Sequence, residues 1–173
     1  LFRSEEIDSI VGRLNAKLKA LGLDRDTLVV LTSDNGPWDE FGNHAGKTPF
    51  REHKATSFEG GIRSAFTVKY PRELKPGTVN DRAFGSIDLY PTLAALAEVP
   101  LQENDTDGKN VWPLMRDVEG AKNPHRHYFI STGWDLEAVI TSDGKWKLHL
   151  PHGYRDVLRP GQDGGRGETK TSM

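Results

Sequence analysis

A short apolar strand that ends in a polar loop constrains the fold of this chain more than any other feature. Residues 27–32 (Thr-Leu-Val-Val-Leu-Thr) form an apolar run rich in β-branched residues, which is typical of a strand buried on both faces of a parallel sheet. The run stops at Ser33-Asp34-Asn35-Gly36-Pro37, whose turn-forming residues predict a loop. Ligands of open α/β sheets gather at the carboxyl ends of the strands. We therefore expect this loop to lie where chemistry takes place.

An amphipathic helix is predicted before this strand, over residues 4–21. Ser4 is a suitable N-cap, and Gly22 follows the last turn, where glycine commonly ends a helix. One face of the helix carries an apolar stripe at helical spacing, made by Ile7, Ile10, Val11, Leu14, Leu18 and Leu21. A helix that leads into a buried strand indicates α/β architecture.

A further strand, over residues 64–70, is expected before a second, smaller unit begins. In that unit we expect a helix over 88–98, a strand over 128–130, and a hairpin of strands 138–141 and 145–150 that turns at Asp143-Gly144. From Arg159 onward the chain is rich in Gly and charge, which predicts a mobile tail. The expected division is an α/β domain over residues 1–75, a smaller α+β subdomain over 76–158, and a flexible tail over 159–173.

Composition excludes several classes of function. The chain has 173 residues, a formal net charge of −2 and no cysteine. We therefore expect no nucleic-acid partner, no disulfide and no thiolate metal site. No apolar stretch approaches the roughly 20 residues of a transmembrane helix, so no membrane span is expected. Because the chain starts at Leu1 and has no basic-then-apolar leader, we expect it to be a segment of a longer protein.

Asp34 and Asn35 are the first candidate site. A carboxylate and a side-chain amide carbonyl, adjacent at a strand end, are two hard oxygen donors that suit Ca²⁺ or Mg²⁺ better than zinc. Asp-Asn-Gly also forms turns, because Asp and Asn bond their own backbone and Gly accepts a positive φ. Taken alone, the pair favours a turn, and a metal site is the alternative.

The second candidate is the polar segment over residues 50–63 (Phe-Arg-Glu-His-Lys-Ala-Thr-Ser-Phe-Glu-Gly-Gly-Ile-Arg). Its lysine, its hydroxyls and its Gly-Gly pair could hold an oxyanion, with Lys54 as a compact point charge. The alternative is a solvated loop in which Glu59 and Arg63 form an ordinary ion pair, and this alternative is favoured when the segment is taken alone.

Taken together, the two segments and the residues after them resemble the sulfatase family. The resemblance rests on the order apolar strand, Ser-Asp-Asn-Gly-Pro, polar loop, Lys-x-Thr-Ser-Phe-Glu-Gly-Gly-Ile-Arg, and then Ser-Ile-Asp-Leu-Tyr-Pro-Thr-Leu over residues 86–93. It extends from the first helix through residues 107–114 to residues 145–148. The resemblance implies the end of an alkaline-phosphatase-like α/β/α domain, followed by a smaller α+β subdomain with an antiparallel sheet.

The resemblance also implies roles for individual residues. Asp34 and Asn35 match the second pair of calcium ligands in the family, and Lys54 matches the lysine that contacts the sulfate and stabilises charge on the bridging oxygen. The remaining matches imply structural roles, in a motif that braces the loop and at the start of a helix: Glu59, Gly60, Gly61, Arg63, Asp88 and Pro91. The family commonly has glycine where this chain has His53 and Ala55, which puts the local geometry around Lys54 in question.

Other polar and aromatic residues allow two interpretations each. His44 lies in the loop between the metal pair and the lysine and could contact substrate. His125 and His127 form a His-x-His pair, which is more often a pair of surface histidines than a metal site. Trp38 and Trp134 could stack on a sugar ring, although large aromatic residues more often serve packing.

The family resemblance implies a sulfuric ester hydrolase that cleaves sulfate monoesters and uses Ca²⁺. Sulfatases attack with a formylglycine made from a Cys or Ser in a C/S-x-P/A-x-R motif, and no such motif occurs in these residues. We therefore expect the nucleophile in a missing N-terminal region and no activity from this segment alone. The expected substrate is a sulfated small molecule or carbohydrate, and the resemblance implies a periplasmic or secreted protein. The alternatives are a phosphatase or phosphodiesterase of the same superfamily, or an inactive fragment that binds sulfated glycans.

Overall fold

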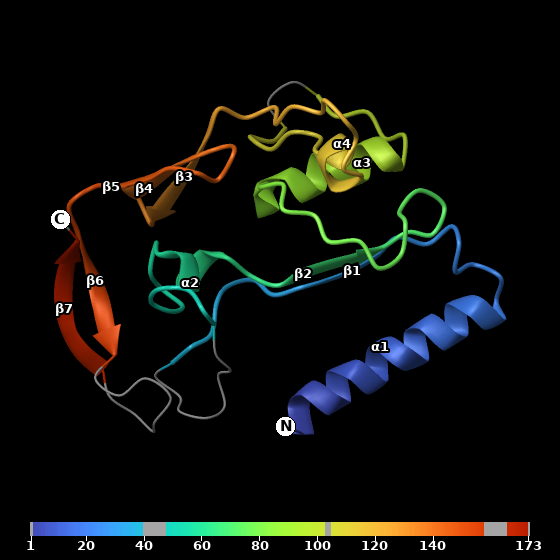
Figure 1. Ribbon diagram of the computed structural model, residues 1–173, viewed down its shortest axis with the longest axis horizontal. Coiled ribbons are helices and arrows are strands. Elements are labelled where there is room, and N and C mark those ends of the chain that lie inside the picture. The colour runs from blue at the N-terminus through green and yellow to red at the C-terminus, as the bar shows by residue number, and fades with distance from the viewer. Residues whose placement is uncertain (1, 40–47, 103–104, 158–165, 173) are drawn as a thin grey trace. The chain divides into compact units, whose positions relative to one another are not determined.

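The computed structural model describes residues 2–39, 48–102, 105–157 and 166–172 (Figure 1). It divides into two compact units, and each is formed by two stretches of the chain. The first unit comprises residues 1–32 and 65–79, and the second comprises residues 33–64 and 80–173. The polar segment after the first strand thus belongs with the later part of the chain. The boundaries expected at residues 75 and 158 stay a prediction.

The first unit contains one helix and a two-stranded ribbon. The helix is α1 (Phe2–Ala20), and the strands are β1 (Val29–Thr32) and β2 (Phe66–Lys69). These elements confirm the predicted helix and both predicted strands. The expectation that β1 is buried in a parallel sheet is wrong here, because β1 pairs antiparallel with β2 and Leu31 is 46% exposed. A ribbon of two strands has too few members to bury both of its faces.

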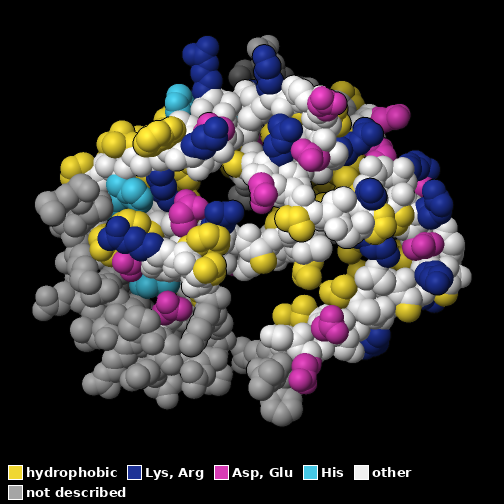
Figure 2. Space-filling view, viewed as in Figure 1, with side chains coloured by type: hydrophobic (Ala, Val, Ile, Leu, Met, Phe, Trp, Pro, Cys, Tyr) yellow, Lys and Arg dark blue, Asp and Glu magenta, His cyan; other side chains and the backbone are white. Residues whose placement is uncertain are grey.

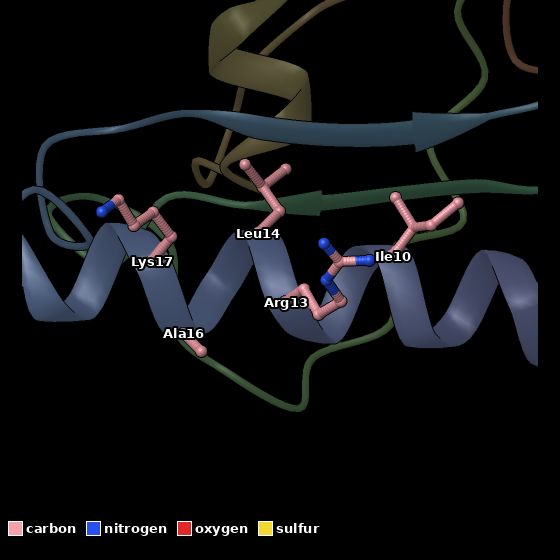
Figure 3. A pocket seen from close by; sticks show the side chains of 5 residues that line it. All are labelled: Ile10, Arg13, Leu14, Ala16 and Lys17. Atoms are coloured by element: carbon pink, nitrogen blue, oxygen red, sulfur yellow. The ribbon is translucent and has the colours of Figure 1, made fainter.

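The apolar stripe of α1 is only partly covered within its own unit. Ile7, Ile10 and Leu14 all remain exposed. Figure 3 shows Ile10 and Leu14 on one side of the helix and Ala16 on the other. These side chains border a pocket of about 700 Å³ that is lined by Ile10, Arg13, Leu14, Ala16 and Lys17. The pocket is a groove along a packing helix and holds no acidic side chain or histidine for chemistry.

The second unit holds the short helices and two further antiparallel sheets. Its helical elements are α2 (Glu59–Ile62), η2 (Ser86–Asp88), α3 (Leu89–Leu96) and α4 (Trp112–Met115). One sheet has the order β3-β4-β5, and a second pairs β6 with β7. The strands are β3 (His127–Thr132), β4 (Asp135–Thr141), β5 (Lys147–His149), β6 (His152–Val157) and β7 (Arg166–Ser172).

The sheets confirm the predicted hairpin and differ from the predicted tail. Strands β4 and β5 pair antiparallel, with Val139 opposite Leu148, and Gly144 adopts φ +70° in the turn between them, as an Asp-Gly turn requires. The α+β subdomain with an antiparallel sheet is thereby confirmed. Residues 166–172, in contrast, fall in the segment expected to be a flexible tail, yet they form β7 and pair with β6. The segment has few apolar residues, so its sequence did not predict a strand, and hydrogen bonds between the backbones of β6 and β7 hold it in place.

Asp88 is a buried hub that ties the second unit together. Its carboxylate is 0% exposed and accepts hydrogen bonds from two backbone groups, Gly85 N at 3.0 Å and Lys109 N at 2.9 Å. It also accepts from the Tyr128 hydroxyl at 3.1 Å and lies 2.6 Å from His125 Nε2. The structural role implied for Asp88 is confirmed. The expectation that His125 lies on the surface is wrong, because its side chain is only 12% exposed beside Asp88, whereas His127 is exposed.

Replacing Asp88 should destabilise the protein strongly. Asp88→Ala removes the buried acceptor that four partly buried donors share, and the free energy of unfolding should fall by about 3 to 5 kcal/mol. Denaturation in urea measures this change, and Asp81→Ala, at an exposed aspartate, is the matched control. A loss below about 1 kcal/mol would contradict the hub.

Tyr128 should remain protonated in strongly alkaline solution. Its burial is the main cause that raises the pKa of the Tyr128 hydroxyl to about 12, and the neighbouring Asp88 charge adds to the effect. Because the folded-state pKa lies above the unfolded value, the stabilisation is complete below about pH 10 and is lost as the pH rises through about 12. Absorbance at 295 nm, compared between wild type and Tyr128→Phe, should assign this tyrosine a titration near pH 12. A titration near pH 10 in the folded protein would contradict the burial.

Candidate active site

The loop after β1 carries the two candidate metal ligands. Ser33 Oγ donates to the Asn35 carbonyl at 3.0 Å, and Asn35 Nδ2 donates to the Gly36 carbonyl at 3.2 Å. The bond to Gly36 uses the amide nitrogen of Asn35, and the amide oxygen is the atom that a hard cation takes. Asp34 is exposed and Asn35 is half-buried. The loop is therefore the turn that the sequence predicts, and the role of Asp34 and Asn35 as metal ligands stays a prediction.

The loop after β1 lies directly against the lysine-bearing segment. Lys54 N donates to the Pro37 carbonyl at 2.9 Å, and Gly36 N donates to the Gly61 carbonyl at 2.9 Å. A Cβ atom added to Gly36 would lie 1.6 Å from the Gly60 carbonyl oxygen, so only glycine fits at this contact. The two segments that the sequence separates are thus joined through their backbones.

The Lys54 ammonium lies over an aromatic ring. Its Nζ atom is 4.7 Å from the centroid of the Trp38 ring, a distance at which the ring quadrupole attracts the cation. Trp38 belongs to the same loop as Asp34 and Asn35 and is 39% exposed. It contacts the cation through its ring face, so packing against Lys54 is the role that the structure supports.

The glycine pair of the lysine segment allows close backbone packing, as predicted. A Cβ on Gly60 would lie 1.8 Å from the Glu52 carbonyl oxygen, and one on Gly61 would lie 2.2 Å from the Thr56 carbonyl oxygen. Gly60 N also donates to the Arg51 carbonyl at 2.7 Å. The segment is therefore folded tightly on itself around these two positions.

The two departures from the family pattern have structural consequences. Ala55 adopts φ +67°, a left-handed conformation that costs a non-glycine residue about 1 to 2 kcal/mol. This conformation explains why a glycine fits that position. His53 is 3% exposed and its Nδ1 donates to the Lys54 carbonyl at 2.8 Å. Its Nε2 is buried without a hydrogen-bond partner among the described residues.

Residues from β5 and β6 also contact the lysine segment, which the sequence analysis did not predict. Lys147 pairs with Glu59 at 3.2 Å, and the Arg63 guanidinium lies 4.5 Å from the centre of the Phe50 ring. The alternative interpretation expected the side chains of Glu59 and Arg63 to pair with each other. Instead, Glu59 pairs with Lys147 and Arg63 lies over Phe50. In the sequence, Lys147 was marked only by its place in residues 145–148, where the family resemblance ends, and this match gave no indication of what Lys147 contacts.

The remaining candidates lie apart from this contact or outside the described residues. His44 falls in residues 40–47 and lies outside the part of the chain that the structure describes. Trp134 is fully exposed in the turn between β3 and β4. Among the described residues, no group of three or more His, Cys, Asp or Glu side chains is placed to hold a metal ion. Ca²⁺ takes six to eight oxygen ligands, so Asp34 and Asn35 fit part of a calcium site.

Comparisons with known proteins identify the family. The sequence model described as Sulfatase matches residues 3–99. The chain is 37% identical to mouse (Mus musculus) steryl-sulfatase over 152 residues, which cover 83% of this chain and 24% of that protein. It is 35% identical to human (Homo sapiens) arylsulfatase A over 149 residues, which cover 84% of this chain and 29% of that protein. The chain therefore spans less than a third of the length of these relatives.

A solved structure agrees with the sequence matches. The PsFucS1 sulfatase from Pseudoalteromonas sp. superposes with a TM-score of 0.80 at 25% identity, over 97% of this chain and 33% of that chain. The overlap covers both units of the chain, and it supports the α/β fold that the sequence predicts.

Substituting Gly36 should separate the two loops. In Gly36→Ala the new Cβ meets the Gly60 carbonyl, and overpacking of this kind typically costs about 1 to 3 kcal/mol. The free energy of unfolding measures the effect. The matched control is Gly12→Ala, whose Cβ meets nothing within 4 Å in the middle of α1 and should stabilise the protein by about 0.5 to 1 kcal/mol. Equal effects of the two substitutions would contradict the close approach at Gly36.

Proposed function

The chain belongs to the sulfatase family, and we propose that its full-length parent hydrolyses sulfate monoesters with calcium and Lys54 in the active site. The observation that carries the proposal is the backbone bond between Lys54 N and the Pro37 carbonyl. This bond holds an ammonium-bearing residue beside a loop with two hard oxygen donors. A cation site and a fixed positive charge around one anion are the elements that ester cleavage at sulfur needs.

Each proposed residue has a distinct chemical task. Asp34 and Asn35 would contribute two of the six to eight oxygen ligands of Ca²⁺, and the bound cation would neutralise charge on the sulfate oxygens. Lys54 would bind the sulfate and donate a hydrogen bond to the bridging oxygen, where charge develops as the ester bond breaks. A donor that is already in place stabilises that charge without reorganisation during the reaction. The nucleophile and the other calcium ligands would come from the rest of the parent.

A phosphatase or phosphodiesterase is the principal rival. The two-zinc sites of that class use histidine beside the aspartate, because imidazole is a good zinc ligand. This chain has Asn35 at that position, and an amide oxygen suits calcium. The identity of this residue therefore favours sulfate over phosphate esters.

The substrate is proposed as a sulfated small molecule or carbohydrate. The relatives carry the names steryl-sulfatase, arylsulfatase A and N-acetylgalactosamine-6-sulfatase, which span aryl, steroid and sugar leaving groups.

On the face that Figure 2 shows, acidic and basic side chains of the described residues are interspersed. Among the described residues, no helix is long and apolar enough to cross a membrane. We further propose periplasmic or secreted localisation on the basis of family membership.

Comparing two ester substrates on the parent protein tests the reaction. The parent should hydrolyse nitrophenyl sulfate faster than nitrophenyl phosphate, and a calcium chelator should abolish the sulfatase activity, which added Ca²⁺ should restore. Faster hydrolysis of the phosphate, or restoration only by Zn²⁺, would overturn the proposal. The segment of residues 1–173 alone should show no turnover.

Lys54→Ala in the parent should lower kcat by about a hundredfold to a thousandfold, as is typical when one preorganised donor to a developing anion is removed. The exposed Lys122 provides the control Lys122→Ala, which should leave kcat unchanged. A Lys54→Ala variant with wild-type kcat and KM would remove Lys54 from the mechanism.

A further inference from the structure

Lys147 of β5 binds the lysine segment at two points. Its ammonium donates to the Ser57 carbonyl and to Glu59 Oε1, the latter at 3.2 Å. The side chain is 14% exposed, and its burial lowers the pKa of Lys147, while Glu59 acts in the opposite direction. A buried ammonium is costly unless its hydrogen bonds are satisfied, and here the segment supplies the acceptors.

His152 of β6 holds the side chain of the same Ser57. His152 Nδ1 lies 2.6 Å from the Leu150 carbonyl, and because a carbonyl only accepts, Nδ1 carries the hydrogen. Nε2 of the same ring lies within hydrogen-bond distance of Ser57 Oγ, at 3.0 Å. Glu137 Oε2 lies 3.4 Å from the same Nε2. Ser57, which is 1% exposed, is therefore bound through both its carbonyl and its hydroxyl.

Phe58 adds an apolar contact between the two hydrogen-bonded positions. Its ring is stacked on His149 with centroids 4.5 Å apart, and it meets Tyr154 edge-on at 4.9 Å. The Arg51 guanidinium lies 4.3 Å from the centre of the Phe58 ring. Phe58 itself is buried, with 6% of its surface exposed. Three consecutive residues, 57–59, are thus held by side chains of β5 and β6.

The held residues are coupled to Lys54 through a tightly bonded turn. Thr56 Oγ1 donates to the His53 carbonyl at 2.7 Å, so the backbone on the two sides of Lys54 is cross-linked. Gly60 N donates to the Arg51 carbonyl at 2.7 Å, which closes the segment. These bonds link the backbone around Lys54 to the residues next to Ser57.

We propose that Lys147 and His152 are positioning residues that hold Ser57, and through it Lys54, in the geometry needed at the active site. The inference rests on the proposed function for its catalytic consequence. Purely apolar packing would fill the same space without the cost of burying an ammonium group. The two polar side chains instead fix the direction of the Ser57 carbonyl and hydroxyl, which a hydrophobic residue cannot do.

The first experiment measures local order and needs no catalytic activity. Hydrogen–deuterium exchange of the parent should be compared for wild type, Lys147→Met, Lys147→Arg and the exposed-site control Lys145→Met. Lys147→Met keeps the length of the side chain and removes the charge, so the amides of residues 54–63 should exchange at least about tenfold faster. Lys147→Arg should restore part of the protection, and Lys145→Met should resemble wild type. Unchanged exchange at residues 54–63 in Lys147→Met overturns the inference.

The second experiment asks whether Lys147 and His152, which together we call the clamp, act through Lys54. In the parent, Lys147→Met and His152→Ala should each lower kcat by about tenfold to a hundredfold with a smaller change in KM, since small misplacements of a catalytic group have effects of this size. In a Lys54→Ala background, Lys147→Met should change kcat by less than about twofold, because residues that act as a unit are not additive. Full additivity of the two substitutions would mean a general structural role and would overturn the positioning claim.

The two experiments separate failure of the clamp from failure of the proposed function. A parent that hydrolyses neither sulfate nor phosphate esters refutes the proposed function, and the exchange measurement then decides the clamp alone. An active parent in which Lys147→Met loosens residues 54–63 but keeps wild-type kcat overturns the inference and leaves the function intact.

Discussion

The close approach of the Gly36 loop to the lysine segment is the constraint on which the rest of the site depends. The contact exists because Gly36 and Gly60 have no side chains, and the backbone bond from Lys54 N to the Pro37 carbonyl then fixes the register of the two segments. A methyl group at Gly36 cannot be accommodated without moving one of them. The proposed calcium ligands and the proposed anion-binding lysine are neighbours as a result of backbone packing, which is stiffer than contact between long side chains.

The later strands give that contact a second layer of support. The chain leaves β1, folds the loop and the lysine segment against residues that come about 90 positions later in the sequence, and only then returns to form β2. This arrangement places the candidate site in the same compact unit as the antiparallel sheets. Lys147 and His152 therefore have a task that is separate from sheet formation, because their polar atoms face the segment that carries Lys54.

Local patterns predicted local structure well, and contacts distant in sequence escaped them. The 3.6-residue period of α1 and the Asp-Gly turn before β5 are properties of a few adjacent residues, and both are confirmed. The antiparallel partner of β1, the pairing of residues 166–172 and the contact of His125 with Asp88 depend on residues far along the chain. The sequence marked Ala55 as a departure from the glycine of the family but did not predict its positive φ. The assignment of Asp34, Asn35 and Lys54 remains a prediction carried by the family resemblance and by the contact between their loops.

A crystal structure of the full-length parent with calcium and a bound sulfate or sulfate analogue tests the central claim most directly. The account predicts oxygen atoms of Asp34 and Asn35 at about 2.3 to 2.6 Å from the cation. It also predicts Lys54 Nζ within hydrogen-bond distance of an oxygen of the anion, about 2.7 to 3.0 Å. A cation bound without Asp34 and Asn35, or a Lys54 ammonium that stays over Trp38 and away from the anion, would contradict it.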